Sequence, residues 1–223
     1  MIDEERLLER LPYWNDLIEL DRARVRSSAC VRRFRKGQLL YSAGCDCLGM
    51  MLVPSGDVRV YIVSEEGREI TLFHLREGDT CVLSASCAIS QITFETAMVA
   101  REDTELIVIP SGEYEQLMAE NIKVRCFTYE LLAERASTIM WVLQQILFKR
   151  LDQRVAECLL ADMERTGSAT LHINQEGIAE QINSAREAVT RQLSRFSDEG
   201  LVEAGRGRVR ILNPQGLAGL LGR

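Results

Sequence analysis

Three charged side chains in the C-terminal third have the chemistry needed to read the edges of DNA bases. Arg186 and Arg191 are five residues apart, and Glu187 lies between them. An arginine fork matches O6 and N7 of guanine, and a carboxylate can accept a hydrogen bond from N4 of cytosine. We therefore predict Arg186, Glu187 and Arg191 as base-reading residues. Glu187 has a second interpretation, because Ser184-x-x-Glu187 also fits a capping box, in which the carboxylate caps its own helix.

Five further side chains near these three are suited to contacts with DNA phosphates. They are Ser184, Thr190, Arg206, Arg208 and Arg210. The three arginines alternate along residues 205–211, which is typical of a two-stranded wing with a Gly-Arg-Gly tip. We predict all five as contacts to the DNA backbone.

Hydrophobic spacing predicts the elements that would position these side chains. Asn174 is a suitable N-cap for a first short helix, and Asn183 suits the tight turn after it. In the second helix, an apolar stripe at i, i+4 and i+7 lies opposite the charged face. It is formed by Val189, Leu193 and Phe196. Helix, turn, polar-faced helix and basic wing together predict a winged helix-turn-helix domain over residues 151–223, with the second helix in the major groove.

Residues 113–149 contain no glycine or proline and predict a long helix. Seven of its side chains form an apolar or amphipathic a/d seam over three heptads. They are Cys126, Tyr129, Ala133, Ala136, Met140, Leu143 and Leu147. Leu132, Ile139 and Ile146 widen the stripe. The seam predicts a dimerisation helix over residues 121–150 that pairs with a second copy, and packing against its own domain is the alternative.

Residues 31–109 have a different character, with short β-type runs separated by glycines. Strands are expected at 31–34, 38–41, 50–53, 58–63, 70–75, 93–99 and 106–109. Gly67 is expected in a hairpin turn, because glycine adopts positive φ freely. Such short, closely spaced strands predict a sandwich or roll, assigned to residues 1–120 and preceded by short helices. The predicted fold class is therefore α+β: a cupin-like β-roll, a long dimerisation helix and a winged helix-turn-helix.

Composition excludes several classes of protein. The net charge of −6 argues against a uniformly basic nucleic-acid coat, but from Leu151 onward there are nine arginines and no lysine. The acidic start does not resemble a signal peptide, and the most apolar run, 139–148, is too short to cross a bilayer. We expect a cytoplasmic protein with no membrane partner, whose seven cysteines are reduced.

From about residue 12 to 213 the chain resembles the Crp/Fnr family of bacterial regulators. The roll carries Gly56-x-Val58-x-Val60-Tyr61, Gly67-Arg68-Glu69 and Gly78-Asp79, and residues 184–191 match the family's recognition helix in form and spacing. The resemblance implies a homodimeric transcription regulator that binds palindromic double-stranded DNA and contacts RNA polymerase. It also implies that a small effector or a redox signal in a cyclic-nucleotide-binding-like roll controls DNA affinity.

The family's effector positions argue against three cofactors. Cyclic-AMP-binding members carry Gly-Glu and Arg-Ser/Thr-Ala where this chain has Val82-Leu83 and Glu95-Thr96-Ala97, and a carboxylate repels a phosphate. Haem-binding members place Cys and His where Val82 and Ser84 stand. Iron–sulfur members need four thiolates, for which Cys45-Asp46-Cys47 is too sparse a match. We therefore expect neither cyclic AMP, haem nor an iron–sulfur cluster, and the effector stays unidentified.

The residues expected to line the effector pocket are small or polar. They are Cys81, Ser84, Ser86, Cys87, Glu95 and Thr96. One interpretation of Cys81 and Cys87 is a redox-active or metal-binding pair, or a thiol-lined pocket. The other is two buried cysteines that act as small hydrophobic residues.

Two rival functions are less consistent with the sequence. A cupin enzyme needs a His/Glu metal constellation, and the chain has only His74 and His172, so we predict no catalytic residue and no metal site. A regulatory module that binds cyclic nucleotides but not DNA would not need the recognition helix or the wing.

Overall fold

The computed structural model describes residues 7–42, 48–85 and 96–222. Contacts between residues divide the chain into two compact units, Met1–Ile139 and Met140–Arg223. The first unit holds two clusters of buried apolar side chains, and the second holds a third cluster. Among the described residues, no helix is long and apolar enough to cross a membrane.

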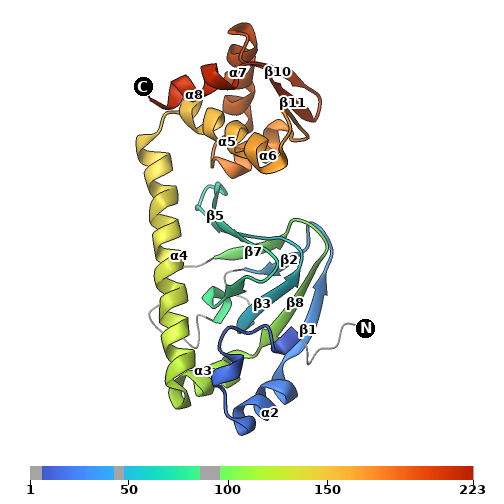
Figure 1. The fold of residues 1–223 in the computed structure, drawn as a ribbon, viewed down its shortest axis with the longest axis vertical. Helices are drawn as coiled ribbons and strands as arrows, with labels where there is room; N and C mark the ends of the chain where they lie inside the picture. Colours follow the sequence, from blue (N-terminus) through green and yellow to red (C-terminus); the bar gives the residue numbers. More distant parts are fainter. Residues whose placement is uncertain (1–6, 43–47, 86–95, 223) are drawn as a thin grey trace. The chain divides into compact units, whose positions relative to one another are not determined.

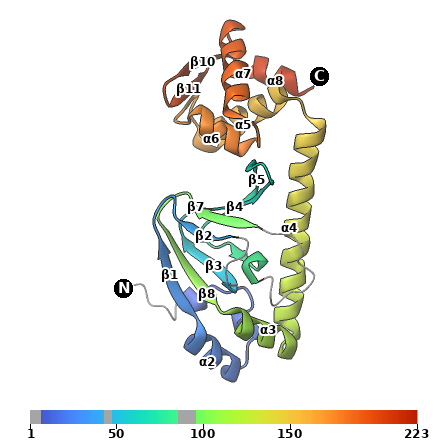
Figure 2. The ribbon, with the colours of Figure 1, turned by 180° about the vertical axis from the view of Figure 1, so that it is seen from behind.

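Two four-stranded antiparallel sheets form the body of the first unit (Figures 1 and 2). One has the strand order β1-β8-β3-β6, and the other has the order β2-β7-β4-β5. The strands are β1 (Cys30–Phe34), β2 (Leu39–Tyr41), β3 (Met50–Ser55), β4 (Val58–Val63), β5 (Glu69–Leu75), β6 (Thr80–Cys81), β7 (Ala97–Ala100) and β8 (Thr104–Ile109). This arrangement confirms the predicted β-roll.

Two parts of the roll can be compared directly with the prediction: the inner strands and the tight hairpin turn between β4 and β5. Strand β8 lies between β1 and β3 in its sheet, and all of its side chains are buried. Gly67, with φ of 78°, forms the turn between β4 and β5, and its N–H donates to the carbonyl of Ser64 at 2.9 Å. This confirms the predicted turn. The strand expected at 93–99 is described from Ala97 onward, and 93–95 lie outside the described residues.

The helices of the first unit are η1 (Trp14–Asp16), α2 (Glu19–Ser28), η2 (Leu83–Ala85), α3 (Ser111–Glu120) and the long α4 (Ile122–Phe148), which continues into the second unit. The expectation of one helix over 113–149 was wrong at Asn121. That residue has extended backbone angles, and its Oδ1 accepts a hydrogen bond from the N–H of Lys123 at 2.9 Å. Asn121 therefore ends α3 and caps α4, which asparagine does well because its short side chain competes for backbone hydrogen bonds.

The second unit packs helices against a small antiparallel sheet of order β10-β11-β9. Its elements are α5 (Leu151–Thr166), β9 (Thr170–Leu171), α6 (Gln175–Gln181), α7 (Arg186–Asp198), β10 (Val202–Gly205), β11 (Arg208–Ile211) and α8 (Pro214–Leu221). The apolar stripe of α7 is buried, with Val189, Leu193 and Phe196 each at most 1% exposed. Helix α8 was not predicted, and its Leu217 is fully buried in the same core. The order of elements confirms the winged helix-turn-helix (Figure 1).

Replacing Asn174 by alanine should lower the unfolding free energy of the second unit. The Asn174 side chain caps α6 as predicted, since its Oδ1 accepts a hydrogen bond from the N–H of Gly177 at 2.8 Å. Loss of such a cap costs about 0.5–2 kcal/mol of unfolding free energy. The measurement is urea unfolding followed by circular dichroism, with Gln175→Ala on the next residue as the control. Equal stabilities of the two variants would contradict the capping role.

Candidate nucleic-acid interface and effector pocket

Helix α7 begins one residue later than the capping-box pattern predicts. Its N-cap is Ala185, which has no side chain that can cap. Ser184 instead belongs to the turn, because its N–H donates to the carbonyl of Ala179 at 2.9 Å. Asn183 before it adopts φ of 53°, the left-handed conformation expected for this tight turn. The predicted Ser184–Glu187 capping box was therefore wrong, because the turn uses Ser184 before the helix begins.

The three predicted base-reading residues share the exposed side of α7. Arg186, Glu187 and Arg191 are all exposed, while the buried stripe of the same helix faces the core. Arg186 Nε lies 3.9 Å from Glu176 Oε2, an exposed pair that contributes little to stability. Within the described residues, neither Glu187 nor Arg191 has a hydrogen bond or ion pair through its side chain. These three groups can therefore meet a partner without first losing a strong internal contact.

The predicted backbone contacts lie in the turn before α7 (Ser184), on α7 (Thr190) and on the β10–β11 hairpin (Arg206, Arg208 and Arg210). Arg206 and Gly207 form the hairpin tip, and the exposed Arg208 and Arg210 alternate with buried residues of β11. Arg210 is 3.9 Å from Glu203 across the hairpin, again between exposed side chains. Thr190 donates its hydroxyl hydrogen to the carbonyl of Arg186 at 2.9 Å, so it offers a phosphate only an acceptor oxygen unless it rotates.

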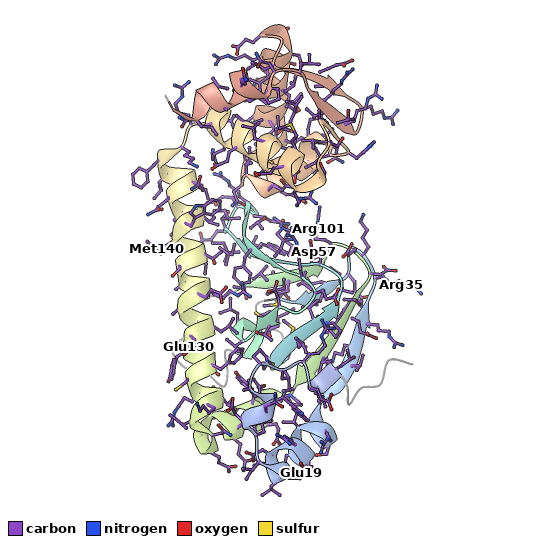
Figure 3. The ribbon with its side chains drawn as sticks, in the orientation of Figure 1. Glu19, Arg35, Asp57, Arg101, Glu130 and Met140 are labelled. Atoms are coloured by element: carbon purple, nitrogen blue, oxygen red, sulfur yellow. The ribbon has the colours of Figure 1, made fainter. Side chains whose placement is uncertain are left out.

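All seven seam residues of α4 are exposed in the single chain. Tyr129 and Met140 are each 58% exposed and Leu147 is 70% exposed, although all three are large and apolar or amphipathic. Figure 3 marks Met140 in the C-terminal half of α4. The middle of the seam consists of the small residues Ala133 and Ala136. Thus the seam lies on a face of α4 that the chain's own core does not cover.

The opposite face of α4 is buried, and the residues on it show that the predicted seam is narrower than expected. Leu131 and Val124 are buried in the core of the first unit. Leu132 and Ile139 pack against the clusters of that unit, so they do not widen the seam as predicted. They lie next to the seam in sequence, but their side chains follow the inner face of the helix.

The effector-pocket residues fall partly within the described chain. Cys81 is fully buried, and burial raises the pKa of its thiol. Because the thiolate is the reactive form, this environment favours an inert cysteine. Ser84 is also fully buried, and its hydroxyl donates to the carbonyl of Gly49 at 2.6 Å. Thr96 is buried, whereas Ser86, Cys87 and Glu95 lie outside the described residues.

Arg135 of α4 contacts the roll and was missed by the sequence analysis. It extends from α4 into the first unit, where its guanidinium lies 4.8 Å from the ring centroid of Phe73 and donates to the carbonyl of Thr80 at 3.3 Å. Asp79 is 4.0 Å away, and Nε of Arg135 is buried with no hydrogen-bond partner among the described residues. The available signal was a charged residue on the otherwise buried face that contains Leu131 and Val142.

Comparisons with known proteins support this architecture. Residues 31–121 match the family profile of the cyclic nucleotide-binding domain, and residues 153–220 match that of the Crp-like helix-turn-helix domain. A solved structure of a transcriptional regulator assigned to the Crp/Fnr family, from Eubacterium rectale, is 40% identical. The match covers 96% of this chain and 100% of that one, with a TM-score of 0.88.

The chain belongs to the Crp/Fnr family. Among curated members, the cyclic AMP receptor protein of Thermus thermophilus is 27% identical over 81% of this chain and 82% of its own length. The transcriptional activator protein FnrA of Stutzerimonas stutzeri is 26% identical over 86% of this chain and 80% of its own length. Crp/Fnr regulators bind DNA and are typically dimeric, so this chain is a DNA-binding transcription regulator of that type.

Proposed function

We propose that this Crp/Fnr regulator acts as a homodimer whose affinity for palindromic DNA is controlled by a small effector or a redox signal in the β-roll. The observation that carries the proposal is the exposed polar face of α7 beside the arginine-bearing wing. Arg186, Glu187 and Arg191 are exposed there on a helix whose other face is anchored in the core. The exposed seam of α4 supports the second half of the proposal, because it supplies a surface for a second copy.

A dimer related by a two-fold axis presents the same recognition helix twice. The two copies of α7 would enter successive major grooves about 34 Å apart, which is one turn of DNA. Each half-site should contain guanines contacted by Arg186 and Arg191, and the family resemblance suggests a TGTGA-like sequence. The wing arginines and Thr190 would bind phosphates and fix the orientation.

Control by the roll requires a route from the pocket to the paired helices. Arg135 offers one, because it lies on α4 and contacts Thr80, the neighbour of the predicted pocket residue Cys81. A ligand or oxidation event that moves this part of the roll would move the guanidinium and the helix that carries it. RNA polymerase is the downstream partner that the family resemblance suggests, in a cytoplasmic setting.

Selection from a pool of random DNA duplexes tests the DNA-binding half of the proposal. The purified protein should enrich a two-fold palindrome with guanines in each half-site, and binding should weaken as salt is raised. Enrichment of asymmetric sequences would contradict the two-fold arrangement. Absence of any enrichment would contradict base reading by α7.

Cyclic AMP should not bind. Leu83 is 3% exposed where cyclic-AMP-binding members place a ribose-binding glutamate, and Glu95 replaces their phosphate-binding arginine. Isothermal titration calorimetry with cyclic AMP should give no saturable heat, using a preparation that still binds its selected DNA. Saturable binding in the micromolar range would contradict this prediction.

A further inference from the structure

A pocket of about 310 Å³ lies within the second unit, where the last turns of α4 meet α5 and the end of α6. Trp141, Val142 and Ile146 form its α4 wall. Ile182 and Asn183, the turn of the helix-turn-helix, form part of the opposite wall. The α4 residues that line the pocket are different from the seam residues. A second copy that pairs through the seam therefore does not have to occupy the pocket.

The lining is mainly apolar and contains a buried hydrogen-bond acceptor that has no donor among the described residues. Gln145 lines the pocket, and its Oε1 is buried with no hydrogen-bond partner among the described residues. A buried acceptor without a donor is unfavourable, and a bound molecule that supplies an N–H or O–H relieves this penalty. The pocket therefore has both an apolar volume and a polar group that lacks a partner, which is the usual composition of a small-molecule site.

Three charged residues line the pocket, and each has a partner: Arg154, Glu157 and Asp162. Arg154 Nη1 donates a hydrogen bond to the carbonyl of Ile182 at 2.9 Å. Glu157 accepts hydrogen bonds from Lys149 Nζ at 2.7 and 2.8 Å, and Asp162 pairs with Arg165 at 2.9 Å. Between these two carboxylates lies Cys158, whose pKa is raised to about 12, first by burial and then by the charges of Asp162 and Glu157. The two carboxylates outnumber the guanidinium of Arg154, so the lining has a net negative charge that disfavours an anionic ligand. A cationic ligand would compete with Lys149 and Arg165 for the carboxylates.

We propose that this pocket binds a small uncharged aromatic molecule that carries a single N–H or O–H donor, which satisfies Gln145. The volume is sufficient for one or two fused rings. Because the same pocket touches α4 and the turn before α7, its occupant fixes the arrangement of these elements within the second unit and changes the affinity for DNA. This site is separate from the effector pocket of the roll.

The experiment uses indole as the probe and 1-methylindole as its matched control, which has a similar shape but no donor. Ligand-detected NMR titrations are done on the full-length protein without DNA, so the result does not depend on the proposed DNA site. Indole should bind saturably and about threefold to tenfold more tightly than 1-methylindole, as expected for one hydrogen bond. Gln145→Met should remove this preference and leave binding of 1-methylindole unchanged.

Ala161→Trp is the variant that fills the pocket, because Ala161 lines it and is exposed, so the fold should tolerate the larger side chain. Ala218→Trp, on the exposed side of α8, adds the same side chain outside the pocket. Indole binding should be lost in Ala161→Trp and kept in Ala218→Trp, and indole should change DNA affinity only in proteins that bind it. Undiminished binding by Ala161→Trp, or equal binding of the two probes by the unaltered protein, would overturn the site. Binding without any change in DNA affinity would overturn its effect on the recognition helix.

Discussion

Replacing Met140 by glutamate is expected to convert the proposed homodimer into monomers. Met140 is 58% exposed in the α4 seam and lies at an a position, where the same residue of a second copy would face it. The substitution would place two carboxylates in the interface with no cation to pair with. An uncompensated buried charge costs about 3–5 kcal/mol, which weakens association by more than about a hundredfold.

Sedimentation velocity at micromolar protein concentration measures this change directly. Gln144→Glu is the matched control, because it introduces the same charge four residues later at an exposed position outside the seam. The control should stay dimeric. If Met140→Glu also stays dimeric while remaining folded, the seam is not the interface, and α4 uses that face in some other way. Loss of the dimer should also reduce affinity for a full palindrome to that for a half-site.

Replacing Arg186 by alanine is expected to relax the sequence preference at one base pair of each half-site. Arg186 is exposed in the first turn of α7, and its Nε lies 3.9 Å from the exposed carboxylate of Glu176. A fork that contacts guanine contributes about 1–3 kcal/mol of discrimination, or roughly fivefold to 150-fold in affinity. Repeating the selection from random duplexes with the variant should therefore give a motif that is degenerate at that position.

Replacing Arg208 by alanine is expected to give a different result, because Arg208 is proposed to position the protein on the DNA backbone and not to read bases. Arg208 is exposed on β11 of the wing, where a phosphate contact would be independent of sequence. The variant should bind all sequences less tightly by a similar factor, with an unchanged motif and a salt slope lower by about one unit. An unchanged motif with Arg186→Ala would mean that α7 does not read the bases as we propose. The wing arginines would then become the next candidates for that role.

Periodic side chains made the architecture predictable. The stripe of Val189, Leu193 and Phe196 and the glycine at position 67 both reflect local geometry, and both predictions were confirmed. Asn121 was missed because nothing in a run of helix-forming residues distinguishes an internal asparagine from a cap. Helix α8 was missed although its start carries a signal. The Asn213 side chain accepts a hydrogen bond from the N–H of Gly216 at 2.8 Å, and Pro214 lies in the first turn. The packing of its Leu217 into the core arises only in the folded unit.

The candidate site was predictable where exposure follows the helical period, and not where contacts arise between distant segments. The charged face of α7 follows from its own sequence, since the buried stripe fixes which residues face outward. Arg135 meets Phe73 and Thr80 only after α4 packs beside the sheets, so sequence spacing alone cannot reveal it. The capping box at Ser184 matched the pattern but was wrong, because the turn at Asn183 determines where α7 begins.

The small side chains in the centre of the seam have a mechanical consequence. If two copies pair there, Ala133 and Ala136 let the helix axes come closer than the larger Tyr129 and Met140 do on either side. The two helices would then pivot at the alanine layer. The distance along the helix from Ala136 to the end of α4 at Phe148 is about 18 Å at 1.5 Å per residue. A rotation of α4 by about 10° about Ala136 moves that end by ~3 Å, given this helical rise. Because Arg135 is next to this pivot, a small displacement of its guanidinium in the roll would produce a larger displacement at the end of the helix.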